Sequence, residues 1–84
     1  MKEHTFEFNE HTYVIRFVPD RKDDVTTYVL SVFEDKNPVR IKNPVTGHQT
    51  TRLTEEEFSE SDTVDKRFQT LESEIKHHGV SSIT

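Results

Sequence analysis

The stretch VTTYVLSVFE, residues 25–34, decides the fold that this sequence predicts. It is rich in β-branched and aromatic residues, which favour a strand over a helix. Both of its alternating sets are apolar, with Tyr28, Leu30 and Val32 on one side and Val25, Val29 and Phe33 on the other. A strand that is apolar on both sides is typical of a position covered on both faces. We therefore expect residues 25–34 to lie at the centre of a sheet.

Two runs with a period of two precede this strand, TFEFN at 5–9 and TYVIRFV at 12–18. The period places their apolar side chains on one face of each run: Phe6 and Phe8 on the first, and Tyr13, Ile15 and Phe17 on the second, with Arg16 pointing away. We expect a tight hairpin that turns through Glu10 and His11 and pairs Phe8 with Tyr13. The charged stretch PDRKDD, residues 19–24, predicts an exposed loop.

The chain between this central strand and residue 54 predicts two shorter strands. The turn-forming stretches DKNP at 35–38 and NPVTGH at 43–48 bracket the strand-like VRIK at 39–42. After the second turn, QTTRL at 49–53 can return as a fifth strand. Because both strands are short and polar, we expect them at the edge of the sheet.

The sequence TEEEF, residues 54–58, contains two signals for the start of a helix. With Thr54 as the N-cap, Glu57 stands at the third helical position, which completes a capping box. Leu53 and Phe58 stand at the positions of a hydrophobic staple. Acidic residues in the first turn also suit the helix dipole. A helix is therefore predicted to begin at Thr54.

Four apolar residues farther along recur at helical spacing: Val64, Phe68, Leu71 and Ile75. Phe58 lies about 120° around the helix axis from this stripe, which predicts a break within residues 59–62. Asp62 is expected to cap the second helical segment, and Gly79 is expected to end it. Residues 81–84 then predict a frayed tail.

Together these segments predict an α+β fold: an antiparallel β-meander of four to five strands at about 4–53, with a C-terminal helical segment at about 54–78 packed on one face. Residues 1–84 are expected to form a single domain, because so short a chain has room for one core. Only 30% of the residues are hydrophobic, so that core must be thin. The expected core residues are Phe6, Phe8, Tyr13, Ile15, Phe17, Leu30, Val32, Phe58, Val64, Phe68, Leu71 and Ile75.

Composition excludes several classes of function. The chain has no Cys and two Gly, which excludes thiolate chemistry and glycine-rich phosphate loops. His77 and His78 would point about 100° apart on a helix, so together they do not make a metal site. We expect no enzymatic activity, no metal and no cofactor. No apolar run is long enough for a signal peptide or a membrane span, and a cytoplasmic location is expected.

The central strand also suggests how the protein functions. One helical segment covers one face of the sheet, so Val25, Val29 and Phe33 need another cover. We therefore expect a non-enzymatic protein–protein interaction module, such as a regulator, inhibitor or assembly factor. Its partner would be a larger protein, or a second copy in a homodimer that self-associates through the uncovered face.

Charge suggests two alternative surfaces. The net charge is −5, and the whole excess lies in residues 54–84, which hold three basic and eight acidic residues. Six of these acids could bind a basic nucleic-acid-binding protein as a decoy: Glu55, Glu56, Glu57, Glu60, Asp62 and Asp65. The start of a helix already accounts for the placement of all of them except Glu60. Arg40, Lys42 and Arg52 could form a basic patch that binds nucleic acid weakly. Residues 1–53 are balanced at eight basic and eight acidic, which disfavours direct nucleic-acid binding.

Overall fold

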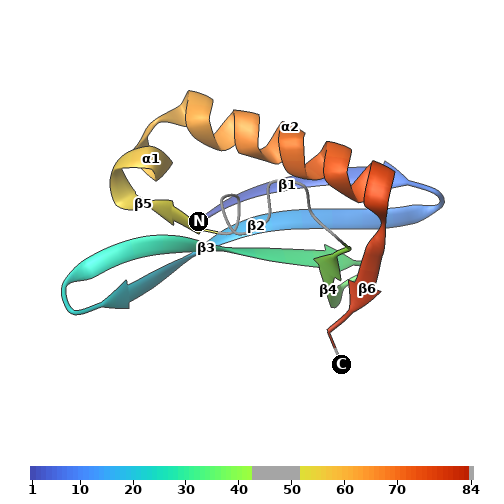
Figure 1. Ribbon diagram of the computed structural model, residues 1–84, viewed down its shortest axis with the longest axis horizontal. Helices are drawn as coiled ribbons and strands as arrows, with labels where there is room; N and C mark the ends of the chain where they lie inside the picture. Colours follow the sequence, from blue (N-terminus) through green and yellow to red (C-terminus); the bar gives the residue numbers. More distant parts are fainter. Residues whose placement is uncertain (43–51, 84) are drawn as a thin grey trace.

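A six-stranded antiparallel sheet packs against two consecutive helices in the computed structural model, which describes residues 1–42 and 52–83 (Figure 1). The elements are β1 (Lys2–Phe8), β2 (His11–Lys22), β3 (Val25–Glu34), β4 (Asn37–Ile41), β5 (Arg52–Thr54), α1 (Glu55–Ser59), α2 (Ser61–His78) and β6 (Val80–Ser82). The strand order is β1-β2-β3-β4-β6, and β5 also pairs with β3. The predicted α+β class is confirmed, and β6 adds a strand to the four or five expected.

The strand β3 is central, as predicted. β2 pairs with it along its whole length, from Val25 to Glu34. On its other side, β4 pairs with residues 32–34 and β5 pairs with residues 27–29. β4 is not an edge strand, contrary to the prediction, because β6 pairs with its outer side. The predicted turn at 43–48 and the first residues of the predicted strand at 49–53 lie outside the described residues.

Three two-residue turns connect β1, β2, β3 and β4, and all six turn residues have positive φ: Asn9 and Glu10, Asp23 and Asp24, and Asp35 and Lys36. Such turns match the right-handed twist of a hairpin. Asn and Asp tolerate left-handed backbone better than most residues, and one of them begins each turn. The first hairpin consequently turns one residue earlier than predicted, and Phe8 pairs with His11 instead of Tyr13.

Two segments that were expected to be irregular are strands. β2 continues to Lys22, so the predicted loop at 19–24 is wrong except for its last two residues. Pro19 is tolerated there because it lies past Phe17, the last β2 residue paired with β1. The C-terminal tail does not simply fray either. Gly79, at a φ of 77°, ends α2 and leads into β6, which pairs with β4.

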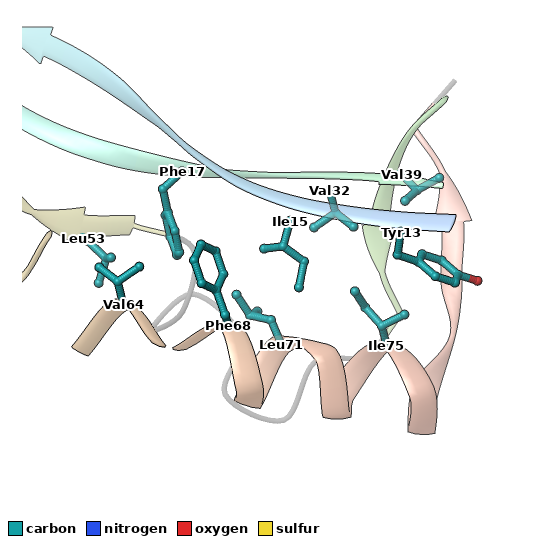
Figure 2. Packing of buried hydrophobic residues seen from close by; sticks show 10 residues of the cluster. All are labelled: Tyr13, Ile15, Phe17, Val32, Val39, Leu53, Val64, Phe68, Leu71 and Ile75. Atoms are coloured by element: carbon teal, nitrogen blue, oxygen red, sulfur yellow. The ribbon is translucent and has the colours of Figure 1, made fainter. Parts of the chain in front are cut away.

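The hydrophobic core lies between the sheet and α2 (Figure 2). Its ten buried side chains are Tyr13, Ile15, Phe17, Val32, Val39, Leu53, Val64, Phe68, Leu71 and Ile75. The predicted residues that are missing from this set are only partly buried and pack against it: Phe6, Phe8, Leu30 and Phe58. Val39 and Leu53 were not predicted, because β4 and β5 are too short and too polar to produce a clear periodic pattern.

The helical region begins with the predicted capping box. The hydroxyl of Thr54 accepts a hydrogen bond from the Glu57 N–H at 3.2 Å. In return, the carboxylate of Glu57 accepts one from the Thr54 N–H at 2.9 Å. These two hydrogen bonds satisfy N–H groups that have no partner within the helix.

The break between α1 and α2 lies at Glu60, inside the predicted range 59–62. α2 begins at Ser61, so Asp62 lies in its first turn and is not the N-cap that was predicted. The break lets Phe58 leave the apolar stripe of α2 and stack on Tyr28, with ring centroids 3.6 Å apart. α1 therefore makes its own contact with β3, apart from the apolar stripe of α2.

We expect Thr54→Ala to lower the free energy of unfolding by about 1 kcal/mol, because the Glu57 N–H loses its acceptor. Urea denaturation of the variant measures this change. Thr54→Ser keeps the hydroxyl and is the matched control, which should retain most of the stability. Equal losses in the two variants would assign the effect to the methyl group and contradict the capping role.

A second polar cluster joins the start of β2 to the turn between β3 and β4. The Asp35 carboxylate accepts a hydrogen bond from the Thr12 N–H at 3.0 Å and lies 2.5 Å from His11 Nδ1. The Thr12 hydrogen bond, together with His11, lowers the pKa of Asp35 below its usual range. The hydrogen bond to Asp35 raises the pKa of His11 above its ordinary value of 6.5.

These pKa shifts predict how stability depends on pH. The raised pKa of His11 stabilises the fold below pH 6.5, and this contribution is lost as the pH rises through the folded-state pKa. The lowered pKa of Asp35 contributes above pH 3.8 and is lost as the pH falls through the folded-state pKa. The pair is therefore most stabilising between these two values.

When the pH rises from about 5.5 to about 8, we expect the free energy of unfolding to fall more in the wild-type protein than in His11→Gln. Urea midpoints of both proteins at the two pH values measure the difference. The Thr12 hydrogen bond to Asp35 remains in the variant, so the comparison isolates the histidine. Identical pH dependence in the two proteins would contradict the assignment.

Candidate interaction surface

Both helices lie on one side of the sheet (Figure 1). On that side, Ile15 of β2 stands across from Val32 of β3, and both point toward α2 (Figure 2). Side chains one residue away along each strand point to the opposite side, called here the open face. No helix lies on the open face within the part of the chain that the structure describes. The sheet therefore presents one of its two faces without helical cover.

The open face contains an apolar strip on the two longest strands, made of Val14 and Val18 on β2 and Val25, Val29 and Phe33 on β3. Val14 stands across from Phe33, and Val18 across from Val29, so each of these apolar pairs spans both strands. Val18 is 36% exposed and Val25 is 61% exposed, while the other three are half-buried by their neighbours in the sheet. The predicted residues Val25, Val29 and Phe33 thus share this face, and β2 extends it.

A row of polar and charged residues crosses the apolar strip between its two pairs. Arg16 of β2 stands across from Glu3 of β1 on one side and Ser31 of β3 on the other. Its Nε lies 2.5 Å from a carboxylate oxygen of Glu3, and its guanidinium carbon lies 5.0 Å from the centre of the Phe33 ring. Arg16 is therefore held against the sheet by an ion pair and a cation–π contact.

Arg40 of β4 continues this row. β4 pairs with β3 through Val39 and Val32, so the next residue of β4, Arg40, lies beside Ser31. On its other side Arg40 stands across from Ser81 of β6. This row, called here the charged row, runs across the sheet from Glu3 through Arg16 and Ser31 to Arg40. It is acidic at the β1 end and basic at the β4 end.

The predicted basic patch is only partly assembled. Arg52 of β5 stands across from Val29, two residues along β3 from Ser31, so Arg40 and Arg52 follow the same side of β3. Arg52 donates hydrogen bonds to Thr27 at 2.6 Å and to Asp20 at 3.4 Å, which engages its guanidinium. Lys42 lies beyond the end of β4, where its backbone N–H donates to Gly79 at 3.0 Å.

The predicted acidic patch lies on α1 and the beginning of α2, at the end of the molecule where β5 meets the helices (Figure 1). Five of its six residues are exposed: Glu55, Glu56, Glu60, Asp62 and Asp65. Glu57 is half-buried, its carboxylate accepts hydrogen bonds from Thr54, and an ion pair of 3.5 Å joins it to Arg67. Hydrogen bonds from the Thr54 N–H and hydroxyl lower the pKa of Glu57 below its usual range.

The chain matches no protein-family model, no curated protein and no solved structure. No helix within residues 1–42 and 52–83 is long and apolar enough to cross a membrane. In the same part of the chain, no three His, Cys, Asp or Glu side chains lie together as ligands for a metal ion.

Val14, Val18, Glu3 and Arg40 were not predicted to share a surface with Val25, Val29 and Phe33. The alternation in residues 12–18 already places Val14 and Val18 opposite the buried side chains of β2. It does not show which β3 residues stand across from them, because that depends on the turn at Asp23 and Asp24. A two-residue turn recognised there would have given the register.

Proposed function

We propose that this protein is a non-enzymatic interaction module that binds a second copy of itself through the open face. The apolar strip made of Val14, Val18, Val25, Val29 and Phe33 is the observation that supports the proposal. These side chains lie on the two longest strands, away from both helices. Burying them against another apolar sheet would remove them from water, which is the main driving force of protein association.

The size of the open face suits such a partner. With strands spaced about 4.8 Å apart and a rise of about 3.3 Å per residue, the strands β1 to β5 together give the open face an area of roughly 600 Å². Standard interfaces bury about 600–1,000 Å² on each partner, so the open face lies at the lower end of that range. Two sheets packed face to face also form a stable two-layer arrangement in many proteins.

The charges on the open face favour a second copy over an unrelated apolar surface. The β1 side presents Glu3 and Glu7, whereas the β4 and β5 side presents Arg40 and Arg52. A partner that presents basic groups toward β1 and acidic groups toward β4 would complement these charges. The open face of a second copy, turned over, has this arrangement.

The test is the molar mass in solution by light scattering across a concentration series, at low and at high salt. We expect a dimer whose population rises with concentration and which persists at high salt, because burial of apolar surface is not screened. A monomer at every concentration and both salt levels would overturn the proposal.

The exposed acidic patch supports a second candidate function, that of a decoy for a basic nucleic-acid-binding protein. Five carboxylates exposed at one end of the molecule produce a negative electrostatic potential that would attract a basic surface. Charge reversal at Glu56 and Glu60 should then weaken binding to such a protein far more than it changes the urea midpoint. Comparable losses in binding and stability would contradict the decoy function and indicate that the acidic residues only stabilise the helices.

A further inference from the structure

We infer that the two copies face each other across a two-fold axis parallel to β2 and β3, which brings Glu3 of each copy against Arg40 of the other. This inference rests on the proposed self-association and specifies its geometry. The charged row, from Glu3 through Arg16 and Ser31 to Arg40, is the observation that fixes the orientation.

A two-fold axis midway between β2 and β3 exchanges the strands in a defined way. It places β2 against the partner's β3, and β1 against the partner's β4. Because the axis is parallel to the strands, each row of residues across the sheet faces the same row of the other copy in reverse order. The contacts at the centre of the interface then follow directly from the strand registers.

In this arrangement the apolar pairs meet each other. Val14 faces the partner's Phe33, and Val18 faces the partner's Val29, on either side of the charged row. Within the charged row, Arg16 faces the partner's Ser31, and Glu3 faces the partner's Arg40. Glu3, the acidic residue of this row, therefore meets a basic residue, and this pair occurs twice because the dimer is symmetric.

The alternative axis, perpendicular to the strands, gives poor contacts. An axis through the charged row would place Arg16 against its own symmetry copy, and likewise Glu3 and Arg40. Like charges facing each other across a closed interface are destabilising. An axis displaced by half the spacing between rows would bury Arg16 against the partner's Val18, which has no side-chain atom that accepts a hydrogen bond, whereas Ser31 has a hydroxyl. The parallel axis avoids both outcomes.

The side chains of the charged row can reach across such an interface. Glu3 is 41% exposed even while it pairs with Arg16, and a carboxylate can accept hydrogen bonds from two guanidinium groups. Arg40 is exposed at the other end of the row. Packed sheets are usually rotated by about 30°, which shifts the ends of the row by less than the length of an arginine side chain.

The test is a charge-swap experiment with Glu3→Arg and Arg40→Glu, studied separately and mixed. Alone, each variant places two pairs of like charges in the dimer, and we expect its dissociation constant to rise about tenfold or more at low salt. In an equimolar mixture, the Glu3→Arg copy has arginine at positions 3 and 40, and the Arg40→Glu copy has glutamate at both. Each contact between position 3 of one copy and position 40 of the other then joins opposite charges. We expect that heterodimer to form with nearly wild-type affinity.

The mixture also controls for effects within one copy. In Glu3→Arg the new arginine lies beside Arg16 both alone and in the mixture, so recovery on mixing can come only from the contact between copies. Asp65→Arg and Lys66→Glu make the same charge changes on the exposed side of α2, away from the open face. These two control variants should each dimerise normally, with no gain on mixing.

The outcomes separate this inference from the proposed function. Weakened single variants with recovery on mixing support the parallel axis. A wild-type dimer with unchanged Arg40→Glu, or weakened variants without recovery, overturns the inference while self-association stands. An unchanged Arg40→Glu would also result if the copies joined edge to edge through β1, because Arg40 lies on β4 at the other side of the sheet. A wild-type monomer at every concentration overturns the inference and the proposed function together.

Discussion

Replacement of Phe17 by alanine is expected to destabilise this protein more than any surface substitution. The Phe17 side chain is fully buried between β2 and α2, with its ring centroid 5.5 Å from that of Phe68. Truncating a buried phenylalanine costs about 3–5 kcal/mol, through lost burial and through the cavity left behind. Domains are stable by about 5–15 kcal/mol in all, and small domains lie near the lower limit. The variant should therefore be largely unfolded at moderate urea concentrations.

Thermal and urea unfolding monitored by circular dichroism measure this loss. For a domain of this length, the expected fall in Tm is roughly 15–30 °C. Phe8→Ala is the matched control, because Phe8 lies near the end of β1 and is only partly buried. It should lose less than half as much stability. Equal losses in the two variants would contradict the assignment of Phe17 to the centre of the core.

Local sequence patterns were sufficient to predict the fold class. The alternation in β2 and β3, the capping box at Thr54 and the helical stripe from Val64 to Ile75 each depend on residues close together in the chain. The structure confirms all three. The hydrophobic effect acts on these periods directly, since each period fixes which side chains share a face.

The errors arise where strand pairing or the geometry of a turn decides the structure. The three residues of β6, Val80–Ser82, are too few to show a strand pattern. They form a strand because they pair with the outer side of β4. β2 extends through Pro19 because β3 pairs with it over the whole hairpin. In the first hairpin, the preference of Asn9 for left-handed backbone outweighed the register inferred from the aromatic residues.

The candidate surface was predicted in part for the same reason. Val25, Val29 and Phe33 follow from the period of β3 alone. The charged row needs four strands aligned in register, and none of its members is distinctive in sequence. From the sequence, Arg16 is an ordinary solvent-facing residue of a strand. Only the structure shows that Glu3, Ser31 and Phe33 surround it. A surface built across strands is visible only after the turns have fixed the registers.

The largest expected effect on function is that of Val29→Lys, at the centre of the open face. In the proposed dimer Val29 faces the partner's Val18, so the lysine ammonium would be buried between two sheets without a partner. Burying an unpaired charge costs several kcal/mol, and the symmetric dimer would contain two such charges. We expect the dissociation constant to rise by about a hundredfold or more, which corresponds to at least about 2.7 kcal/mol.

The folded monomer should tolerate this substitution, which makes it a test of association and not of folding. Val29 is half-buried on a face without helical cover, and a lysine there can extend its ammonium into water. Light scattering at concentrations where the wild type is dimeric, together with urea unfolding of both proteins, separates the two effects. Gln69→Lys adds the same charge on the exposed side of α2 and should leave the dimer intact. Val29→Thr keeps the β-branched shape with less apolar surface and should give an intermediate affinity. If Val29→Lys dimerised as tightly as the wild type, the open face could not be the interface, because no sheet-to-sheet contact centred on β2 and β3 leaves position 29 in water.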